Sequence, residues 1–237
     1  MVYLINDVMD REQDRRHPVK RARPIASGVL TVRTASTAAA IIGSIALGWS
    51  FWISVRLGIV AISYVALLTL YSFVLKRFII LDVLTIAIGF VLRAVAGGVA
   101  ISVPISEWLL VCTILLALFL ALSKRRHELV LLAENATAVR STLDEYSPYL
   151  LDQMIGVVTA STVMSYILYA IDPNTVAHFG TASLGLTIPM PLYGIFRYLY
   201  LVHRKGGGIP SELLLTDRPL LICVALWALA VVLIVYW

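Results

Sequence analysis

The chain alternates long apolar segments with shorter polar loops. The apolar segments lie at residues 34–53, 57–75, 79–101, 107–123, 148–171, 180–202 and 219–237. Most are close to the ~20 residues that an α-helix needs to cross a bilayer. None shows the alternation over ~10 residues that is typical of membrane β-barrel strands. The pattern therefore predicts an all-α fold, a polytopic bundle of about seven transmembrane helices in a single integral-membrane domain over residues 1–237.

The composition supports a membrane location. Hydrophobic residues make up 60% of the chain and charged residues 14%, whereas an average soluble domain has ~25% charged residues. The net charge of +5 does not indicate a nucleic-acid partner, because the bases lie in loops between apolar segments and no nucleic-acid motif is present. Cys112 and Cys223 each lie inside an apolar segment, which argues against a disulfide framework or a thiolate metal site.

The basic residues predict how the bundle is oriented. All of the 19 lysines and arginines except Arg56 and Arg93 fall in loops, or at helix ends, on one side of the predicted bundle. These stretches are residues 7–33, 76–77, 124–140 and 197–218. Loops rich in Lys and Arg stay in the cytoplasm. We therefore expect a multi-pass protein of the plasma membrane with these loops on its cytoplasmic side.

An amide and three acids near the start are spaced for one face of a helix. They are Asn6, Asp7, Asp10 and Asp14. At ~100° per residue they fall within roughly one quadrant, so their charges would repel one another unless a cation lies between them. Oxygen ligands of this kind suit Mg²⁺ held together with substrate phosphates. A solvated charged loop beside a membrane helix is the alternative interpretation.

Bases that accompany the acids are candidates for binding phosphate. Lys20 and Arg23 follow the acids directly and are interpreted as a phosphate clamp. Arg93 lies near the middle of an apolar segment, where a guanidinium is costly unless it faces a polar cavity. We interpret Arg93 as a cavity-facing phosphate ligand; a structural ion pair with an acid of a neighbouring helix is the alternative.

A second charged cluster follows the fourth full span. Lys124 and Glu128 are four residues apart, on one face of a helix, and Arg125 lies beside them. One interpretation is an ordinary cytoplasmic basic cluster with an intrahelical ion pair. The other is a site that binds an anion directly rather than through a metal.

The motifs together resemble a known family. Asn-Asp-x-x-Asp-x-x-x-Asp followed by His-Pro-x-Lys-x-x-Arg-Pro, over residues 6–24, resembles the first signature of the UbiA superfamily of intramembrane prenyltransferases. Lys-Arg-x-x-Glu-Leu at residues 124–129 stands where many members carry a second Asp-rich motif. It is similar to the replacement in the decaprenyl-phosphate phosphoribosyltransferase branch, as are stretches within 76–98, 140–146 and 197–218. Arg126-His127 is more basic than that branch leads us to expect.

The resemblance implies roles for the charged residues. The implied Mg²⁺ ligands are Asn6, Asp7, Asp10 and Asp14. The implied catalytic residues are Asp7, Asp10, Lys124 and Arg125, and the implied substrate-binding residues are Lys20, Arg23, Lys76, Arg93 and Glu128. The family also has one helix and most of a second before the acid motif, so we expect this chain to be truncated at its N-terminus.

The function implied by the resemblance is transfer of 5-phosphoribose from phosphoribosyl diphosphate to a polyprenyl phosphate, for cell-wall arabinan precursor synthesis. The partners are then these two substrates and the membrane; a homo-oligomer is compatible with the sequence. One alternative is a UbiA-type prenyltransferase that alkylates an aromatic acceptor with a prenyl diphosphate, although the missing second Asp-rich motif argues against it. The other is an inactive truncated protein, or a non-catalytic membrane protein or transporter.

Overall fold

The structure is a computed structural model that describes residues 1–16, 20–131, 145–204, 213 and 215–236. The chain forms two compact units, each described here by itself. Unit 1 comprises residues 1–105 and 132–147, and unit 2 comprises residues 106–131 and 148–237. Some motif residues noted in the sequence lie outside the described residues: His17 of the first loop, Arg140, Lys205 and the stretch 208–212.

The described residues form helices and no strands, which confirms the predicted all-α class. Among the described residues, six helices are long and apolar enough to cross a membrane. They are α4 (Val32–Ile53), α5 (Val55–Phe73), α6 (Leu81–Ala100), α7 (Glu107–Leu131), α9 (Pro148–Ile171) and α13 (Arg218–Tyr236). In α4, large apolar side chains such as Ile41, Ile45 and Trp52 are exposed. These residues suit contact with lipid.

The apolar segment predicted at 180–202 follows a sharp bend. α10 (Pro173–Phe179) precedes the bend, and a helical stretch from Ser183 that leads into α11 (Pro189–Arg204) follows it, with an angle of 101° between the two pieces. Gly180 takes a left-handed φ of 70° at the end of α10. The described spans therefore number six, or seven if the bent pair counts as one.

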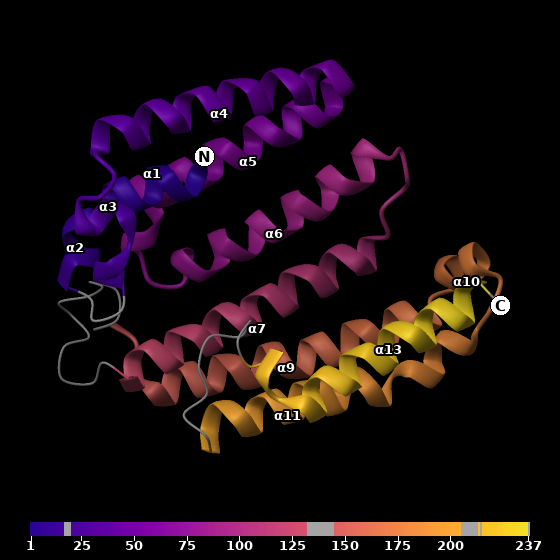
Figure 1. The fold of residues 1–237 in the computed structure, drawn as a ribbon. Coiled ribbons are helices and arrows are strands. Elements are labelled where there is room, and N and C mark those ends of the chain that lie inside the picture. The colour runs from indigo at the N-terminus through magenta and orange to yellow at the C-terminus, as the bar shows by residue number, and fades with distance from the viewer. Residues whose placement is uncertain (17–19, 132–144, 205–212, 214, 237) are drawn as a thin grey trace. The chain divides into compact units, whose positions relative to one another are not determined.

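Unit 1 begins with short helices that carry the acid motif (Figure 1). They are α1 (Val2–Met9), α2 (Arg11–Arg16), η1 (Lys20–Ala22) and α3 (Pro24–Ser27). Asp10 ends α1 with φ −92° and ψ 5°, so the acids lie on two consecutive helices rather than on one. α1 packs against α4 and α5. α4 and α5 form a tight hairpin in which Ser54 caps α5 by accepting a hydrogen bond from the Leu57 N–H at 3.1 Å.

Unit 2 consists of α7, α9, α10, α11 and α13, with the turn η4 (Ser183–Thr187) before α11 (Figure 1). α7 and α9 pack along each other, and α11 packs against α13. α7 continues to Leu131, eight residues beyond the predicted end of its apolar segment at residue 123. The charged residues Lys124 and Glu128 are therefore part of the helix that also crosses the membrane.

Candidate active site

Arg23 joins two acids of the motif. Its Nη1 atom donates a hydrogen bond to Asp7 Oδ1 at 2.8 Å and another to Asp14 Oδ2 at 2.9 Å. Asp7 lies on α1 and Asp14 on α2, and only 5% of the Asp14 surface is exposed. One guanidinium therefore holds carboxylates of two consecutive helices, and the basic end of the motif folds back onto its acids.

Asp10 is paired with a base from a distant part of the sequence. Lys76 Nζ donates to Asp10 Oδ1, and both side chains are largely buried. Lys76 lies in η2 (Leu75–Arg77), directly after α5. One turn before it, Ser72 Oγ hydrogen-bonds to Asn6 Oδ1 at 3.4 Å. The end of α5 and η2 thus hold the acid motif at two points. The structure places Lys76 beside the acids, and its role in binding substrate stays a prediction.

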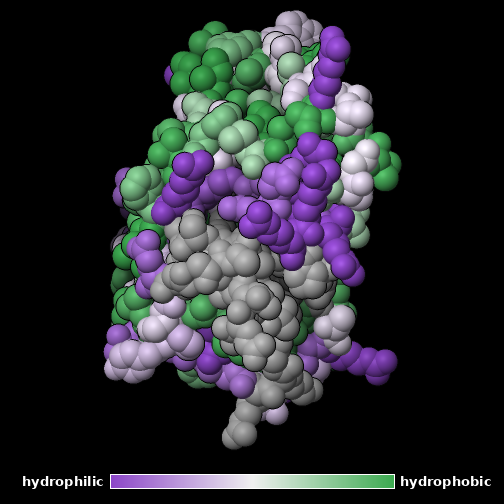
Figure 2. All heavy atoms as spheres, turned by 90° about the vertical axis from the view of Figure 1, so that its left-hand side faces the viewer, coloured by the Kyte–Doolittle hydropathy of each residue, from purple (hydrophilic) through white to green (hydrophobic). Residues whose placement is uncertain are grey.

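Burial and neighbouring charges shift the pKa of Asp7. Burial raises the pKa of Asp7 above its ordinary value, and the nearby carboxylates of Asp14 and Asp10 raise it further, while the charges of Arg23 and Lys20 oppose the change. Lys20 therefore acts on the acids through its charge, and its role in a phosphate clamp stays a prediction. Figure 2 shows hydrophilic side chains gathered at this end of unit 1, next to the apolar surface of its spans.

The side chains here fit Mg²⁺ by their chemistry. Asp7, Asp10 and Asp14 offer oxygen ligands and Asn6 adds an amide oxygen, which are the ligand types that Mg²⁺ prefers. Within the described part of the chain, however, no three acidic, histidine or cysteine side chains are already arranged as a metal-ligand set. The carboxylates instead face Arg23 and Lys76. A divalent ion would thus compete with two cations of the protein for the same oxygens.

Unit 2 holds the second charged cluster on the last turns of α7. Arg125 is buried, with 3% of its surface exposed, and its Nη1 donates to Glu128 Oε2 at 2.9 Å. Lys124, its neighbour in sequence, is exposed. The sequence predicted a helical cluster at this position, and the structure shows an ion pair between residues three apart, with one of its two bases turned into the protein.

A further group of charges next to this cluster was not predicted. Arg126 binds Asp152 of α9 through Nε at 2.5 Å and Nη2 at 3.3 Å, and His203 Nε2 of α11 lies 3.2 Å from the same carboxylate. These contacts tie three helices together at one end. The partners are 26 and 51 residues apart, so no local spacing in the sequence could have indicated the group. The basic character of Arg126 was the only signal.

Arg93 is held by aromatic side chains. Its guanidinium donates from Nε to the Tyr64 hydroxyl at 2.9 Å and lies 5.3 Å from the centre of the Phe90 ring. No acid forms an ion pair with Arg93 among the described residues. The Tyr64 phenol and the Phe90 ring thus contact the cation within unit 1, and its predicted role as a phosphate ligand stays a prediction.

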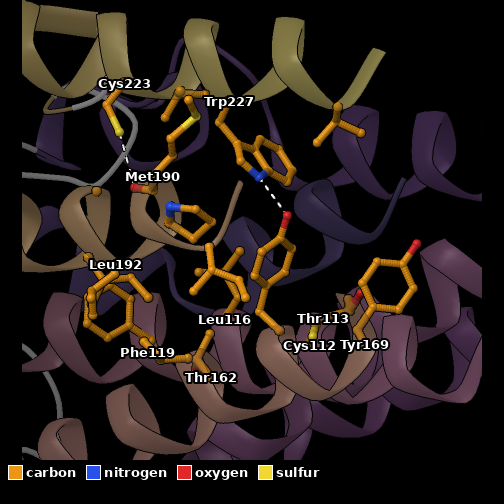
Figure 3. A pocket seen from close by; sticks show the side chains of 18 of the residues that line it. Cys112, Thr113, Leu116, Phe119, Thr162, Tyr169, Met190, Leu192, Cys223 and Trp227 are labelled. Carbon is orange, nitrogen blue, oxygen red and sulfur yellow. Dashed lines mark hydrogen bonds between the residues drawn. The ribbon is translucent and has the colours of Figure 1, made fainter. Parts of the chain in front are cut away.

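An apolar cavity of about 540 Å³ lies in unit 2, among α7, α9, α11 and α13 (Figure 3). The Trp227 indole donates to the Tyr166 hydroxyl at 2.9 Å, and the hydroxyls of Tyr166 and Thr187 are hydrogen-bonded at 2.6 Å. These polar groups are satisfied by one another, so the cavity offers a carbon surface to whatever occupies it. Phe119 of its lining is only six residues before Arg125, or about 9 Å of helix.

The chain belongs to the UbiA prenyltransferase family, whose sequence profile matches residues 1–216. Among its relatives, the decaprenyl-phosphate phosphoribosyltransferase of Corynebacterium glutamicum is 36% identical over 99% of this chain and 71% of that protein. The proteins of the same name from Mycolicibacterium smegmatis and Mycobacterium tuberculosis are each 33% identical over 95% of this chain, and the matches cover 73% and 74% of those proteins. The similarity spans both the acid motif and the α7 cluster.

Proposed function

We propose that the protein is a decaprenyl-phosphate phosphoribosyltransferase, which transfers 5-phosphoribose from phosphoribosyl diphosphate to a polyprenyl phosphate. The observation that carries the proposal is the 33–36% identity, over nearly the whole chain, to three proteins of that name. The separation of charge into an acid-rich cluster in unit 1 and a base-rich cluster in unit 2 supports it. The finer assignment to an arabinan precursor of the cell wall is part of the same proposal.

The proposed reaction is a displacement at the anomeric carbon of the ribose. An oxygen of the lipid phosphate forms the new bond to this carbon, and the bond from the carbon to the diphosphate oxygen breaks, so that diphosphate leaves with the bonding electron pair. The attacking phosphate is already an anion, and no general base is needed. The protein's task is therefore to bring two anions together and to stabilise the charge that develops on the leaving group.

The charged residues divide this task. Mg²⁺, held by Asn6, Asp7, Asp10 and Asp14, would supply positive charge to the diphosphate. Bases neutralise the remaining phosphate charge: Lys20, Arg23 and Lys76 in unit 1, with Arg93, and Lys124 and Arg125 in unit 2. Glu128 keeps the buried Arg125 guanidinium in place through their 2.9 Å contact.

The apolar cavity of unit 2 suits the isoprenoid chain of the lipid substrate. Its walls are apolar and aromatic, and one end lies near the basic end of α7. A polyprenyl phosphate has the matching shape, an apolar chain with an anion at one end. The cavity is smaller than a long polyprenyl chain, so the far end of such a chain would extend into the bilayer.

The reaction is proposed to occur on the cytoplasmic side of the plasma membrane, because nearly all bases lie on one side of the predicted bundle. Reporter fusions after Arg23, Arg126 and Lys205 should report cytoplasm, and a fusion after Asp172 should report the opposite side. A mixed result among the first three would mean that the spans have been assigned wrongly.

The deciding assay offers both reactions to the same membranes. Membranes containing the protein are given labelled phosphoribosyl diphosphate with decaprenyl phosphate, or a labelled prenyl diphosphate with 4-hydroxybenzoate. We expect labelled phosphoribosyl lipid and free diphosphate in the first case and no product in the second. The opposite result would support the prenyltransferase named by the family. Membranes without the protein are the control.

A further inference from the structure

Tyr146 is buried at the start of α6 although it lies more than sixty residues later in the sequence. Its hydroxyl donates to Asp82 Oδ1 at 2.9 Å and accepts from the backbone N–H of Ile80 at 2.8 Å. The two side chains are nearly inaccessible, with 4% of Tyr146 and 0% of Asp82 exposed. All three residues belong to unit 1. Since Asp82 cannot reach a substrate, this contact holds the fold rather than binding a ligand.

The backbone that Tyr146 contacts is strained. Ile80 has φ 68° and ψ −46°, and the N–H of Leu81 donates to the carbonyl of Ile79 at 2.8 Å. These are the features of a γ-turn with positive φ, a rare and strained conformation. A β-branched residue is a marked outlier there, and such outliers persist only where the surroundings enforce them.

The strained turn is next to a residue of the candidate active site. Lys76 lies in η2, four residues before Ile80, and pairs with Asp10. On one side η2 continues from α5, where the N–H of Val74 donates to Leu70. On the other side it runs through Phe78 and Ile79 into the γ-turn. The direction in which Lys76 leaves the backbone therefore depends on both α5 and the turn.

We propose that Tyr146 is a positioning residue for Lys76. Its hydroxyl holds the γ-turn at Ile80, and the turn sets the position of η2, so that the Lys76 ammonium reaches the acid cluster. The inference rests on the proposed function, in which this cluster and Lys76 bind the diphosphate of the sugar donor. It assigns Tyr146 an effect on that substrate and none on the lipid phosphate.

The first test is Tyr146→Phe, which keeps the ring and removes the hydroxyl. The N–H of Ile80 loses its acceptor, and we expect amide exchange in residues 78–84 to become about tenfold faster, the scale of one lost buried hydrogen bond. The KM for phosphoribosyl diphosphate should rise by a similar factor, with little change in kcat or in the KM for decaprenyl phosphate. Tyr149→Phe is the matched control, because Tyr149 is exposed and hydrogen-bonds only locally, with Gln153.

The second test is rescue. Glycine adopts positive φ readily, so in Ile80→Gly the turn should no longer depend on its hydrogen bond to the Tyr146 hydroxyl. The double variant Tyr146→Phe/Ile80→Gly should recover most of the wild-type KM, and should recover folded protein if Tyr146→Phe alone folds poorly. Failure of this rescue contradicts the proposal. So does a Tyr146→Phe variant whose amides in residues 78–84 exchange at the wild-type rate, or whose KM values rise equally for both substrates.

The amide-exchange measurement separates the two hypotheses. If the wild-type protein does not use phosphoribosyl diphosphate, the proposed function fails. Faster exchange in residues 78–84, reversed by Ile80→Gly, would still show that Tyr146 holds the turn that follows Lys76. If the wild type does use it and exchange does not respond to Tyr146→Phe, only the role of Tyr146 is wrong.

Discussion

The acid cluster of unit 1 and the basic cluster of unit 2 satisfy their charges in opposite ways. In unit 1, the carboxylates of the acid motif face the cations of Arg23 and Lys76 in the ion pairs described above, and the charge of Lys20 also acts on Asp7. In unit 2, Arg125 pairs with Glu128 of its own helix, and Arg126 and His203 share the carboxylate of Asp152. Under the proposed function, the first cluster accepts a cation and the second accepts an anion.

The two clusters also differ in which elements supply the residues that hold them together. Arg23 comes from within the motif itself, a few short helices further along the chain. Arg125 and Arg126 are fixed by acids on rigid spans. We therefore expect changes in unit 1 to affect metal dependence, and changes in unit 2 to affect anion binding.

The largest expected effect is loss of all transfer in Asp10→Asn. The substitution keeps the size of the side chain but removes the negative charge of a proposed metal ligand. Labelled phosphoribosyl lipid in membranes should fall to background at an unchanged protein level. Glu12→Gln is the matched control, because Glu12 is an exposed acid of the same motif that pairs with Arg15. Full activity in Asp10→Asn would remove the acid motif from the mechanism.

The next effect tests the basic cluster. Lys124→Ala and Arg125→Ala should each lower transfer by roughly a hundredfold or more, the scale of one preorganised charge contact of ~3 kcal/mol. Arg125→Ala also removes the 2.9 Å contact to Glu128, so Arg125→Ala/Glu128→Ala tests whether stability recovers while transfer does not. Arg218→Ala, an exposed base at the start of α13, is the control. Loss of transfer equal to that of the control would place the cluster outside the mechanism.

A smaller effect is expected from the contacts of Asp152 on α9 with Arg126 on α7 and His203 on α11. Asp152→Asn weakens the contacts to Arg126 and His203, but the Asp152 side chain is partly exposed, and such pairs contribute about 0.5–1 kcal/mol. The midpoint of thermal unfolding in detergent should fall by a few degrees, with transfer lowered only severalfold. A loss as large as that of Arg125→Ala would mean that Asp152 also positions the anion site.

The smallest effect concerns stability without metal. Because the folded protein raises the pKa of Asp7, the folded state binds the Asp7 proton more tightly than the unfolded state does. This contribution to the free energy of unfolding is present below the unfolded pKa and is lost as pH rises through the folded pKa. At neutral pH without Mg²⁺, Asp7→Asn should therefore unfold at a slightly higher temperature than the wild type, although it is inactive. A lower temperature would show that the charge of Asp7 stabilises the fold through Arg23.

The sequence predicted those parts of the fold that depend on composition and short spacing. Apolar segments gave the positions of the spans. Spacings of three and four residues placed Asp7, Asp10 and Asp14 on one helix face, whereas the structure divides them between α1 and α2. The bend between α10 and the stretch from Ser183 was missed because hydrophobicity alone does not record a broken backbone, although Gly180 lies in that gap.

Contacts between distant residues could not be predicted in the same way. The pairing of Asp10 with Lys76 depends on how α1 packs against α5, and the carboxylate shared by Arg126 and His203 depends on the packing of three helices. Nothing in the spacing of these residues encodes either contact. The resemblance placed Lys76 among the substrate-binding residues, and the structure adds the acid that it faces.

The cavity of unit 2 has a practical consequence for labelling chemistry. Cys112 and Cys223 are the only cysteines in the chain, and both line this cavity, one from α7 and the other from α13 (Figure 3). A small membrane-permeant alkylating reagent therefore reports on the cavity of the natural sequence without an engineered residue. An occupant shields both thiols together, whereas Cys223, whose Sγ contacts the Met190 carbonyl at 3.2 Å, should be the slower of the two when the cavity is empty. The mass of the alkylated protein then gives the number of thiols that have reacted, which indicates whether the cavity is occupied.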